Sequence, residues 1–220
     1  MNIIFVRHGH PDYKNDCLTE LGHLQAKAAA ERLKNEKIDE FFSSSCGRAY
    51  ETALHIAELH NSEVTKLDFM REIKWTAHPW TLAREGWVAN GKDIMNPDWA
   101  NDETLKGDAV IEAYNTVSKS FDEWLKEFGL CREGDYYRMV EECDKTILLA
   151  SHGGSSTVVL SHIFNMPFPF VCRALMPDFT AITKVSFGGS HCKKGDLISP
   201  TFVIANDSRH IEGVTTESIN

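Results

Sequence analysis

The sequence is poor in basic residues and has no long apolar run. Its 220 residues contain 23 lysines and arginines against 32 aspartates and glutamates, so the formal net charge is −9. An acidic surface repels nucleic acid and anionic membranes, so neither is an expected partner. No apolar stretch is long enough to cross a bilayer. Any anionic substrate must therefore be bound by a local positive pocket.

The sequence also lacks closely spaced cysteines, a secretory leader and low-complexity linkers. Its six cysteines are scattered, which excludes a disulfide framework or a cysteine-rich metal centre. The first residues lack the basic start and small-residue cleavage site of a signal peptide, so a reduced, cytoplasmic setting is expected. No stretch rich in proline, glycine or serine divides the chain, and no repeat is present. A single domain over 1–220 is predicted.

Helices alternate with strands along most of the sequence. Apolar runs predict strands at 2–7, 38–44, 64–70 and 146–150. Helical spacing of apolar residues predicts helices at 20–33, 48–59, 110–128 and 153–163, and two final strands at 181–187 and 201–205 are expected to add antiparallel. The acidic stretch 132–144 is interpreted as a loop or a short helix. The fold class is α/β, a three-layer α/β/α sandwich with a mostly parallel central sheet and an antiparallel edge.

Polar residues follow two of these strands. Arg7 and His8 end the first, and His152 follows the strand at 146–150. Strand ends are where open α/β sheets carry out chemistry. Arg48 stands at the start of a predicted helix, where the dipole disfavours a cation but attracts an anion. A functional reason for this arginine is therefore expected.

These motifs, in this order, resemble the histidine phosphatase superfamily, also called the phosphoglycerate-mutase-like family. The matching segments are Arg7-His8-Gly9, the Leu-Thr-x-x-Gly-x-x-Gln-Ala motif at 18–26, the Ser-Ser-x-x-x-Arg-Ala-x-x-Thr-Ala motif at 44–53 and Ser-His-Gly-Gly at 151–154. The resemblance spans nearly the whole chain and is weakest between 75 and 137.

The resemblance implies a phosphomonoesterase that uses a phosphohistidine intermediate, with no metal or organic cofactor. His8 would attack phosphorus through one ring nitrogen while a backbone carbonyl holds the other N–H. Arg7 and Arg48 would bind phosphate oxygens with their fork-shaped donors. His152, protonated when phosphate is bound, would add a third cation, and the backbone N–H of Gly153 would assist.

A departing alkoxide also needs a general acid. The resemblance assigns this role to Glu72, which follows the third strand, and predicts a raised pKa for it. The family's Gly-x-x-Glu-Gly continuation is missing after Glu72, so Glu85 and Asp12 remain alternatives. Asn15 is the nearest candidate for the asparagine with which the family often binds phosphate, one position out of register.

The irregular, tryptophan-rich segment that follows corresponds to the family's variable cap, so 73–140 is predicted to form a cap insertion and the helix after it. The expected partner is a small phosphoester, and the protein itself a monomer or homodimer. Two other functions remain open. One is phosphoglycerate mutase-type transfer, which returns the phosphoryl group to a hydroxyl. The other is a non-catalytic phosphate-binding regulatory module.

Overall fold

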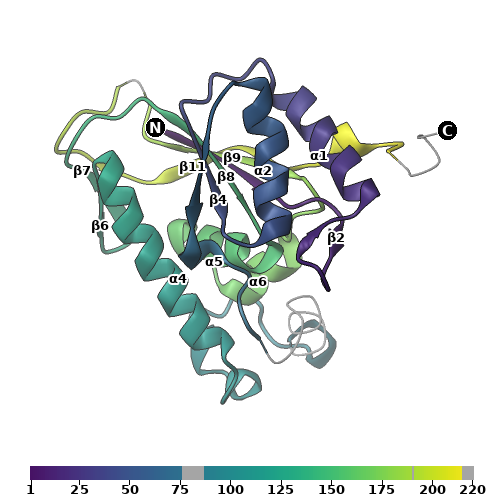
Figure 1. The fold of residues 1–220 in the computed structure, drawn as a ribbon. Coiled ribbons are helices and arrows are strands. Elements are labelled where there is room, and N and C mark those ends of the chain that lie inside the picture. Colours follow the sequence, from purple (N-terminus) through teal and green to yellow (C-terminus); the bar gives the residue numbers. More distant parts are fainter. Residues whose placement is uncertain (76–86, 190, 215–220) are drawn as a thin grey trace.

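A computed structural model describes residues 1–75, 87–189 and 191–214. Its central sheet has six strands in the order β11-β9-β1-β8-β4-β5 (Figure 1). Neighbours among β1, β8, β4 and β5 run parallel. β9 pairs antiparallel with β1, and β11 pairs antiparallel with β9, which confirms the predicted sheet. The strands are β1 (Asn2–Arg7), β4 (Glu40–Ser44), β5 (Val64–Leu67), β8 (Thr146–Ser151), β9 (Ile182–Phe187) and β11 (Pro200–Asp207).

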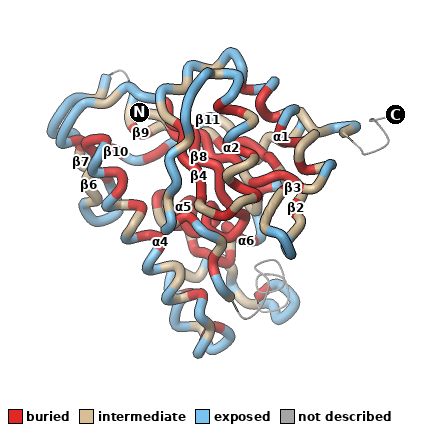
Figure 2. Tube along the Cα trace, viewed as in Figure 1, coloured by how far each residue is buried: buried red, intermediate tan, exposed pale blue. Residues whose placement is uncertain are grey.

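Side chains point alternately to the two faces of the sheet along each strand, so both faces carry apolar residues, and helices cover both. In β1, Ile4 and Val6 pack against α1 (Glu20–Leu33) and α2 (Gly47–Leu59). Ile3 and Phe5 face the other way, toward α4 (Val110–Leu125), α5 (Gly153–Phe164) and α6 (Phe168–Ala174). Figure 2 shows the central strands as the most continuously buried part of the chain. The three predicted layers are therefore present.

The helix boundaries follow the capping residues. Thr19 precedes α1, and its hydroxyl accepts a hydrogen bond from the backbone N–H of Gly22 at 3.1 Å, as an N-cap does. The buried stripe of α4 includes Phe121 and Trp124. A 3₁₀ turn, η6 (Lys126–Phe128), extends it, and Gly129 ends it in the left-handed region at φ 76°.

Two predictions about the strands were wrong. The third strand ends at Leu67, where a 3₁₀ turn, η1 (Asp68–Met70), takes over. The stretch 132–144 contains most of a hairpin made by β6 (Leu130–Glu133) and β7 (Tyr136–Met139), and β10 (Leu197–Ile198) joins it. Tyr137 and Met139 are buried while Tyr136 is exposed, and Gly134 makes the turn at φ 59°. Charged neighbours masked this alternation in the sequence.

The remaining elements are short. They are the paired strands β2 (Pro11–Asp12) and β3 (Cys17–Leu18) and the 3₁₀ turns η3 (Val88–Asn90), η4 (Trp99–Asn101), η5 (Glu103–Leu105) and η7 (Arg209–Ile211). In the predicted cap, Trp99 packs on Tyr114 of α4 and Phe168 of α6, at ring distances of 4.9 and 5.5 Å. Within the described ranges, no helix is both long and apolar enough to span a membrane.

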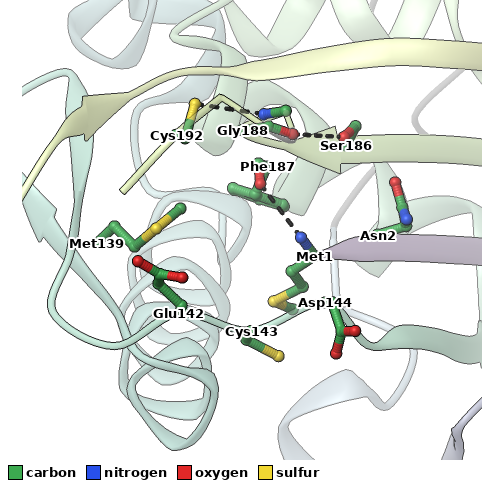
Figure 3. Close-up of a pocket in the computed structure, with 11 residues that line it drawn as sticks. Met1, Asn2, Met139, Glu142, Cys143, Asp144, Ser186, Phe187, Gly188 and Cys192 are labelled. Carbon is green, nitrogen blue, oxygen red and sulfur yellow. Dashed lines mark hydrogen bonds between the residues drawn. The ribbon is translucent and has the colours of Figure 1, made fainter. Parts of the chain in front are cut away.

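A cavity of about 510 Å³ lies where β1 begins, at the opposite end of that strand from Arg7 (Figure 3). Its wall includes Met1, Glu142, Cys143 and Cys192. The amino group of Met1 donates to the Phe187 carbonyl at 3.4 Å. None of the predicted site residues lines this cavity, so the chemistry belongs to the other end of the strands.

Candidate active site

The parallel pairing of β1 and β8 brings the two predicted histidines together. Arg7, the last residue of β1, is in register with Ser151, the last residue of β8. The residues that follow, His8 and His152, therefore emerge at the same sheet edge. Their ring centroids are 5.2 Å apart, and both residues are fully buried.

His8 is held in the state that a nucleophile needs. Its Nδ1 lies 2.7 Å from the carbonyl oxygen of Gly9, which can only accept, so Nδ1 carries the proton and Nε2 keeps its lone pair. Burial lowers the pKa of His8 to about 3, and the charges of Arg7 and Arg48 act in the same direction. The imidazole is therefore neutral at physiological pH, with Nε2 available for attack.

Arg48 lies in the first turn of α2, and its Nε donates to His8 Nε2 at 3.4 Å. Its guanidinium is held by Asp16, whose carboxylate lies 2.5 Å from Nη1 and also accepts the backbone N–H of Gly47 at 2.9 Å. Asp16 was not predicted. Asn15, the predicted residue next to it, is exposed and donates instead to Asp12 at 2.7 Å.

Arg7 and His152 each have one buried nitrogen that makes no hydrogen bond to the described residues. Arg7 Nη1 donates to the Pro177 carbonyl at 2.7 Å, and His152 Nε2 lies 2.8 Å from Ser44 Oγ. Within the described residues, Arg7 Nε and His152 Nδ1 have no hydrogen-bond partner. Unsatisfied buried donors are costly and rare. Together they indicate that the site is built for an anion.

The charge of His152 depends on that anion. Burial lowers the pKa of His152 well below its ordinary value, with His8 and the two arginines, Arg48 and Arg7, adding to the effect. The ring is therefore neutral while the site is empty, and a bound phosphate would favour its protonation. Gly153 opens α5 here, and a Cβ built on it would lie only 3.6 Å from Arg7 Nε.

Glu72 lies against His152, with its Oε2 3.8 Å from Nδ1. Burial raises the pKa of Glu72, although Arg48, Arg7 and two backbone N–H groups oppose the effect. One of those N–H groups belongs to Gly154, where a Cβ would approach Glu72 Oε1 to 2.5 Å. A carboxyl group with a raised pKa at the edge of the site is suited to act as a general acid.

Asp12 and Glu85 were the alternatives to Glu72 as general acid. Hydrogen bonds from Asn15 lower the pKa of Asp12, which makes its carboxyl group a poor proton donor near neutral pH. Glu85 lies outside the described residues. The geometry therefore favours Glu72.

Three of these groups also have the donor types of a metal centre. One ligand atom from each of His8, Glu72 and His152 lies within 4.8 Å of the others, and no other such group occurs in the part of the chain that the structure describes. Arg7 and Arg48 flank it, and their charges lower the pKa of both histidines. The positive charges of the two arginines would also repel a metal cation, so the residues fit an anion better.

Besides Asp16, sequence reasoning missed three supporting residues. Thr52 Oγ1 accepts a hydrogen bond from the Gly9 N–H at 3.1 Å and donates one to the Arg48 carbonyl at 2.8 Å. It therefore links the turn after β1 to the first turn of α2. Thr52 and Ser44 both belong to the motif at 44–53, so the signal was present. Phe179, whose ring lies 4.4 Å from the Arg7 guanidinium and 5.8 Å from the His8 ring, gave no sequence signal.

Known proteins share this sequence pattern and fold. Phosphoserine phosphatase 1 of Hydrogenobacter thermophilus is 30% identical over 139 residues, which cover 57% of this chain and 65% of that protein. A 2,3-bisphosphoglycerate-dependent phosphoglycerate mutase of Thermoplasma acidophilum is 39% identical over 71 residues, or 28% of this chain and 36% of that one. The alignment thus spans less than two thirds of either relative.

Solved structures extend the similarity of fold to most of the chain. A phosphoserine phosphatase of Entamoeba histolytica, solved with phosphoserine, has a TM-score of 0.65 at 21% identity and covers 96% of this chain and 98% of its own. A mycobacterial glucosyl-3-phosphoglycerate phosphatase has a TM-score of 0.63 at 21% identity, with coverage of 93% and 98%. The model of the histidine phosphatase superfamily (branch 1) matches residues 3–196, and the chain belongs to this superfamily.

Proposed function

We propose that this protein hydrolyses a small phosphomonoester through a phosphohistidine intermediate on His8. The observation that carries the proposal is a pair of buried nitrogens, Arg7 Nε and His152 Nδ1, without hydrogen-bond partners among the described residues, beside the unprotonated Nε2 of a neutral His8. This arrangement supplies a nucleophile and the donors that a phosphoryl group requires.

In the first step, the lone pair of His8 Nε2 forms a bond to phosphorus as the bond from phosphorus to the ester oxygen breaks. Glu72 gives its proton to the leaving oxygen. Arg7 and Arg48 bind the equatorial oxygens, where the negative charge is spread. His152 takes part as a donor that becomes charged in the presence of the phosphoryl group.

In the second step, the Glu72 carboxylate removes a proton from water. The water oxygen bonds to phosphorus as the bond from phosphorus to nitrogen breaks, which releases phosphate and restores the neutral imidazole. This chemistry uses only the side chains of the chain itself, so we propose that no metal or organic cofactor is required. Activity is expected to persist in a chelator.

The test is phosphate release from a panel of phosphorylated metabolites and from p-nitrophenyl phosphate, with His8→Ala alongside. The wild type should be active and His8→Ala should lose essentially all turnover. An acid-labile phosphoryl group should be trapped on the wild type but not on His8→Ala. Appreciable activity in His8→Ala would refute the mechanism.

A second candidate is mutase-type transfer, in which a sugar-acid hydroxyl replaces water in the second step. The observation that favours it is the 39% identity over 71 residues to the Thermoplasma acidophilum mutase. Conversion of 3-phosphoglycerate to 2-phosphoglycerate, dependent on a bisphosphoglycerate primer, would support this candidate. Phosphate release without a primer would support the phosphatase.

A further inference from the structure

Arg71 is a cation at the edge of the site that the proposed mechanism does not use. It follows η1 directly and precedes Glu72, and its side chain is exposed. Its Nη1 donates to Ser45 Oγ at 3.1 Å. Ser45 comes directly after β4, which pairs with β5 in the sheet. Arg71 and Ser45 therefore meet at the sheet edge that carries the catalytic groups.

The charge of Arg71 is available to a ligand. Arg48 is paired with Asp16, and the Arg7 guanidinium is held by a backbone carbonyl. Across 1–75, 87–189 and 191–214, by contrast, Arg71 forms no ion pair, and its guanidinium donates to the neutral Ser45 hydroxyl. In a chain of net charge −9, an exposed arginine without a carboxylate partner is a binding group for an anion.

Arg71 is also close to the reacting groups. Ser45 follows Ser44, whose hydroxyl lies 2.8 Å from His152 Nε2. The charge of Arg71 contributes, after burial and the nearer cations, to the lowered pKa of His152. A cavity of about 340 Å³ is lined by both Arg71 and Glu72. A molecule that places its phosphoryl group on His8 would therefore have Arg71 within reach of its remaining part.

We propose that Arg71, with Ser45 beside it, binds a carboxylate of the substrate, so that the substrate is a short phosphomonoester that carries one. This inference rests on the proposed phosphatase function and narrows its substrate class. The planar guanidinium fork matches the two oxygens of a carboxylate. Lys74 lines the same cavity, and so do the carboxylates of Asp68 and Glu112, so the proposal rests on the Arg71 guanidinium and not on a broad positive surface. The phosphoryl group and the carboxylate would thus be held by separate arginines.

The experiment compares O-phosphoserine with O-phosphoethanolamine, which differ only by the carboxylate. For the wild type, kcat/KM should be at least tenfold higher for phosphoserine. Because a hydrogen bond to a charged group contributes the equivalent of roughly 10- to 100-fold, Arg71→Ala should lower kcat/KM for phosphoserine by that factor. The loss on phosphoethanolamine and p-nitrophenyl phosphate should be at least fivefold smaller, and Arg71→Lys should recover part of the loss on phosphoserine.

Arg138→Ala is the matched control, since Arg138 is an arginine of β7 paired with Glu133 and removing it changes the net charge equally. It should leave both substrates unaffected. Equal losses on both substrates in Arg71→Ala, or a wild type that does not distinguish them, would overturn the inference.

Binding separates this inference from the proposed function. Both compounds can be titrated calorimetrically into His8→Ala protein, with and without Arg71→Ala. A preference for phosphoserine that needs Arg71 supports the subsite even if the wild type hydrolyses neither compound, a result that would refute the phosphatase alone. Hydrolysis of both compounds without such a preference would refute the subsite and leave the phosphatase.

Discussion

At the scale of single residues, the nucleophile and the general acid of the proposed mechanism need opposite protonation states. His8 must be neutral, and burial lowers its pKa to about 3. Glu72 must be protonated, and burial raises its pKa above the ordinary value of about 4.3 for glutamate. The active protonation state therefore lies between these two pKa values. The wild type should be most active in mild acid and should lose activity as the pH rises through the pKa of Glu72.

The Glu72→Gln variant tests this assignment. With alkyl phosphates, it should lose roughly 10²- to 10⁴-fold in kcat, because their leaving oxygen needs a proton. With p-nitrophenyl phosphate the loss should be small, and the fall in kcat/KM caused by Glu72 at higher pH should disappear. Asp12→Asn is the control and should keep the wild-type profile. A wild-type profile in Glu72→Gln would place the acid elsewhere.

Asp16 is a positioning residue, because it acts through the guanidinium of Arg48 and the backbone of Gly47. Asp16→Ala should lower kcat/KM by about tenfold as Arg48 loses its fixed orientation. Asp16→Asn keeps an oxygen for the Gly47 N–H and should retain more activity. Lys14→Ala, an exposed change in the same loop, should have no effect. If Asp16→Ala raised kcat/KM, the carboxylate would be a competitor of phosphate rather than a support for Arg48.

The loop around Asp16 also shows where sequence reasoning stopped. The strand ends carrying Arg7, His8 and His152 could be predicted, because apolar runs locate buried strands and the motifs give their order. The choice between Asn15 and Asp16 could not, since it depends on which side chain reaches Gly47 across the fold. Loop register is set by such tertiary contacts, which leave no periodic signal in the sequence.

At the scale of elements, α1 supports the turn that carries the nucleophile. Gly22 lies in its first turn, and a Cβ there would come within 2.2 Å of the His10 carbonyl oxygen. Gly9 is equally close to α1, since its Cβ would lie 2.5 Å from the Gly22 carbonyl oxygen. The Arg-His-Gly turn and the helix can therefore approach only because both residues are glycine.

Gly22→Ala should consequently reverse the usual effect of this substitution. In a helix, replacing glycine by alanine ordinarily stabilises by about 1 kcal/mol. Here the clash with the backbone should lower the free energy of unfolding, by roughly 1–3 kcal/mol, and displace His8 enough to reduce activity. Urea unfolding measures the first effect and phosphate release the second. Lys27→Ala, an exposed change in α1, should stay within about 0.5 kcal/mol of the wild type.

Elements that lack a clear period were the ones the sequence did not predict. The β6–β7 hairpin has only four residues in each strand, and its buried positions, such as Tyr137, alternate with charged side chains such as Arg138. A short amphipathic strand of this kind has the composition of a polar loop. The long stripe of α4, with Phe121 and Trp124 buried, was predicted because it repeats over four turns.

At the scale of the whole molecule, the net charge of the protein and the charge of the site have opposite signs. The net charge of −9 is spread over a surface rich in carboxylates, while Arg7, Arg48 and Arg71 gather at one sheet edge. Such a local field attracts a small anion but gives no extended surface for a polyanion. The architecture thus combines a generally acidic exterior with a local positive site suited to a small anion.

The same burial that prepares the site makes folding sensitive to acid. Of the ten histidines, His8, His55, His152 and His210 have pKa values lowered by burial. Where the folded pKa is below the unfolded value of about 6.5, the unfolded chain binds more protons, so stability falls as the pH drops below 6.5. For His8 this contribution to stability is lost as the pH falls from 6.5 to about 3.

The melting temperature of the wild type should therefore fall as the pH is lowered from 7 to 5. The melting temperature of His8→Asn should fall less, since asparagine does not titrate. His60→Asn, at the C-cap of α2, is the matched control substitution. Orthophosphate should raise the melting temperature of the wild type by mass action. Because a bound anion favours protonated His152, part of the acid loss should be recovered with phosphate. An equal acid loss in His8→Asn and the wild type would show that other groups dominate.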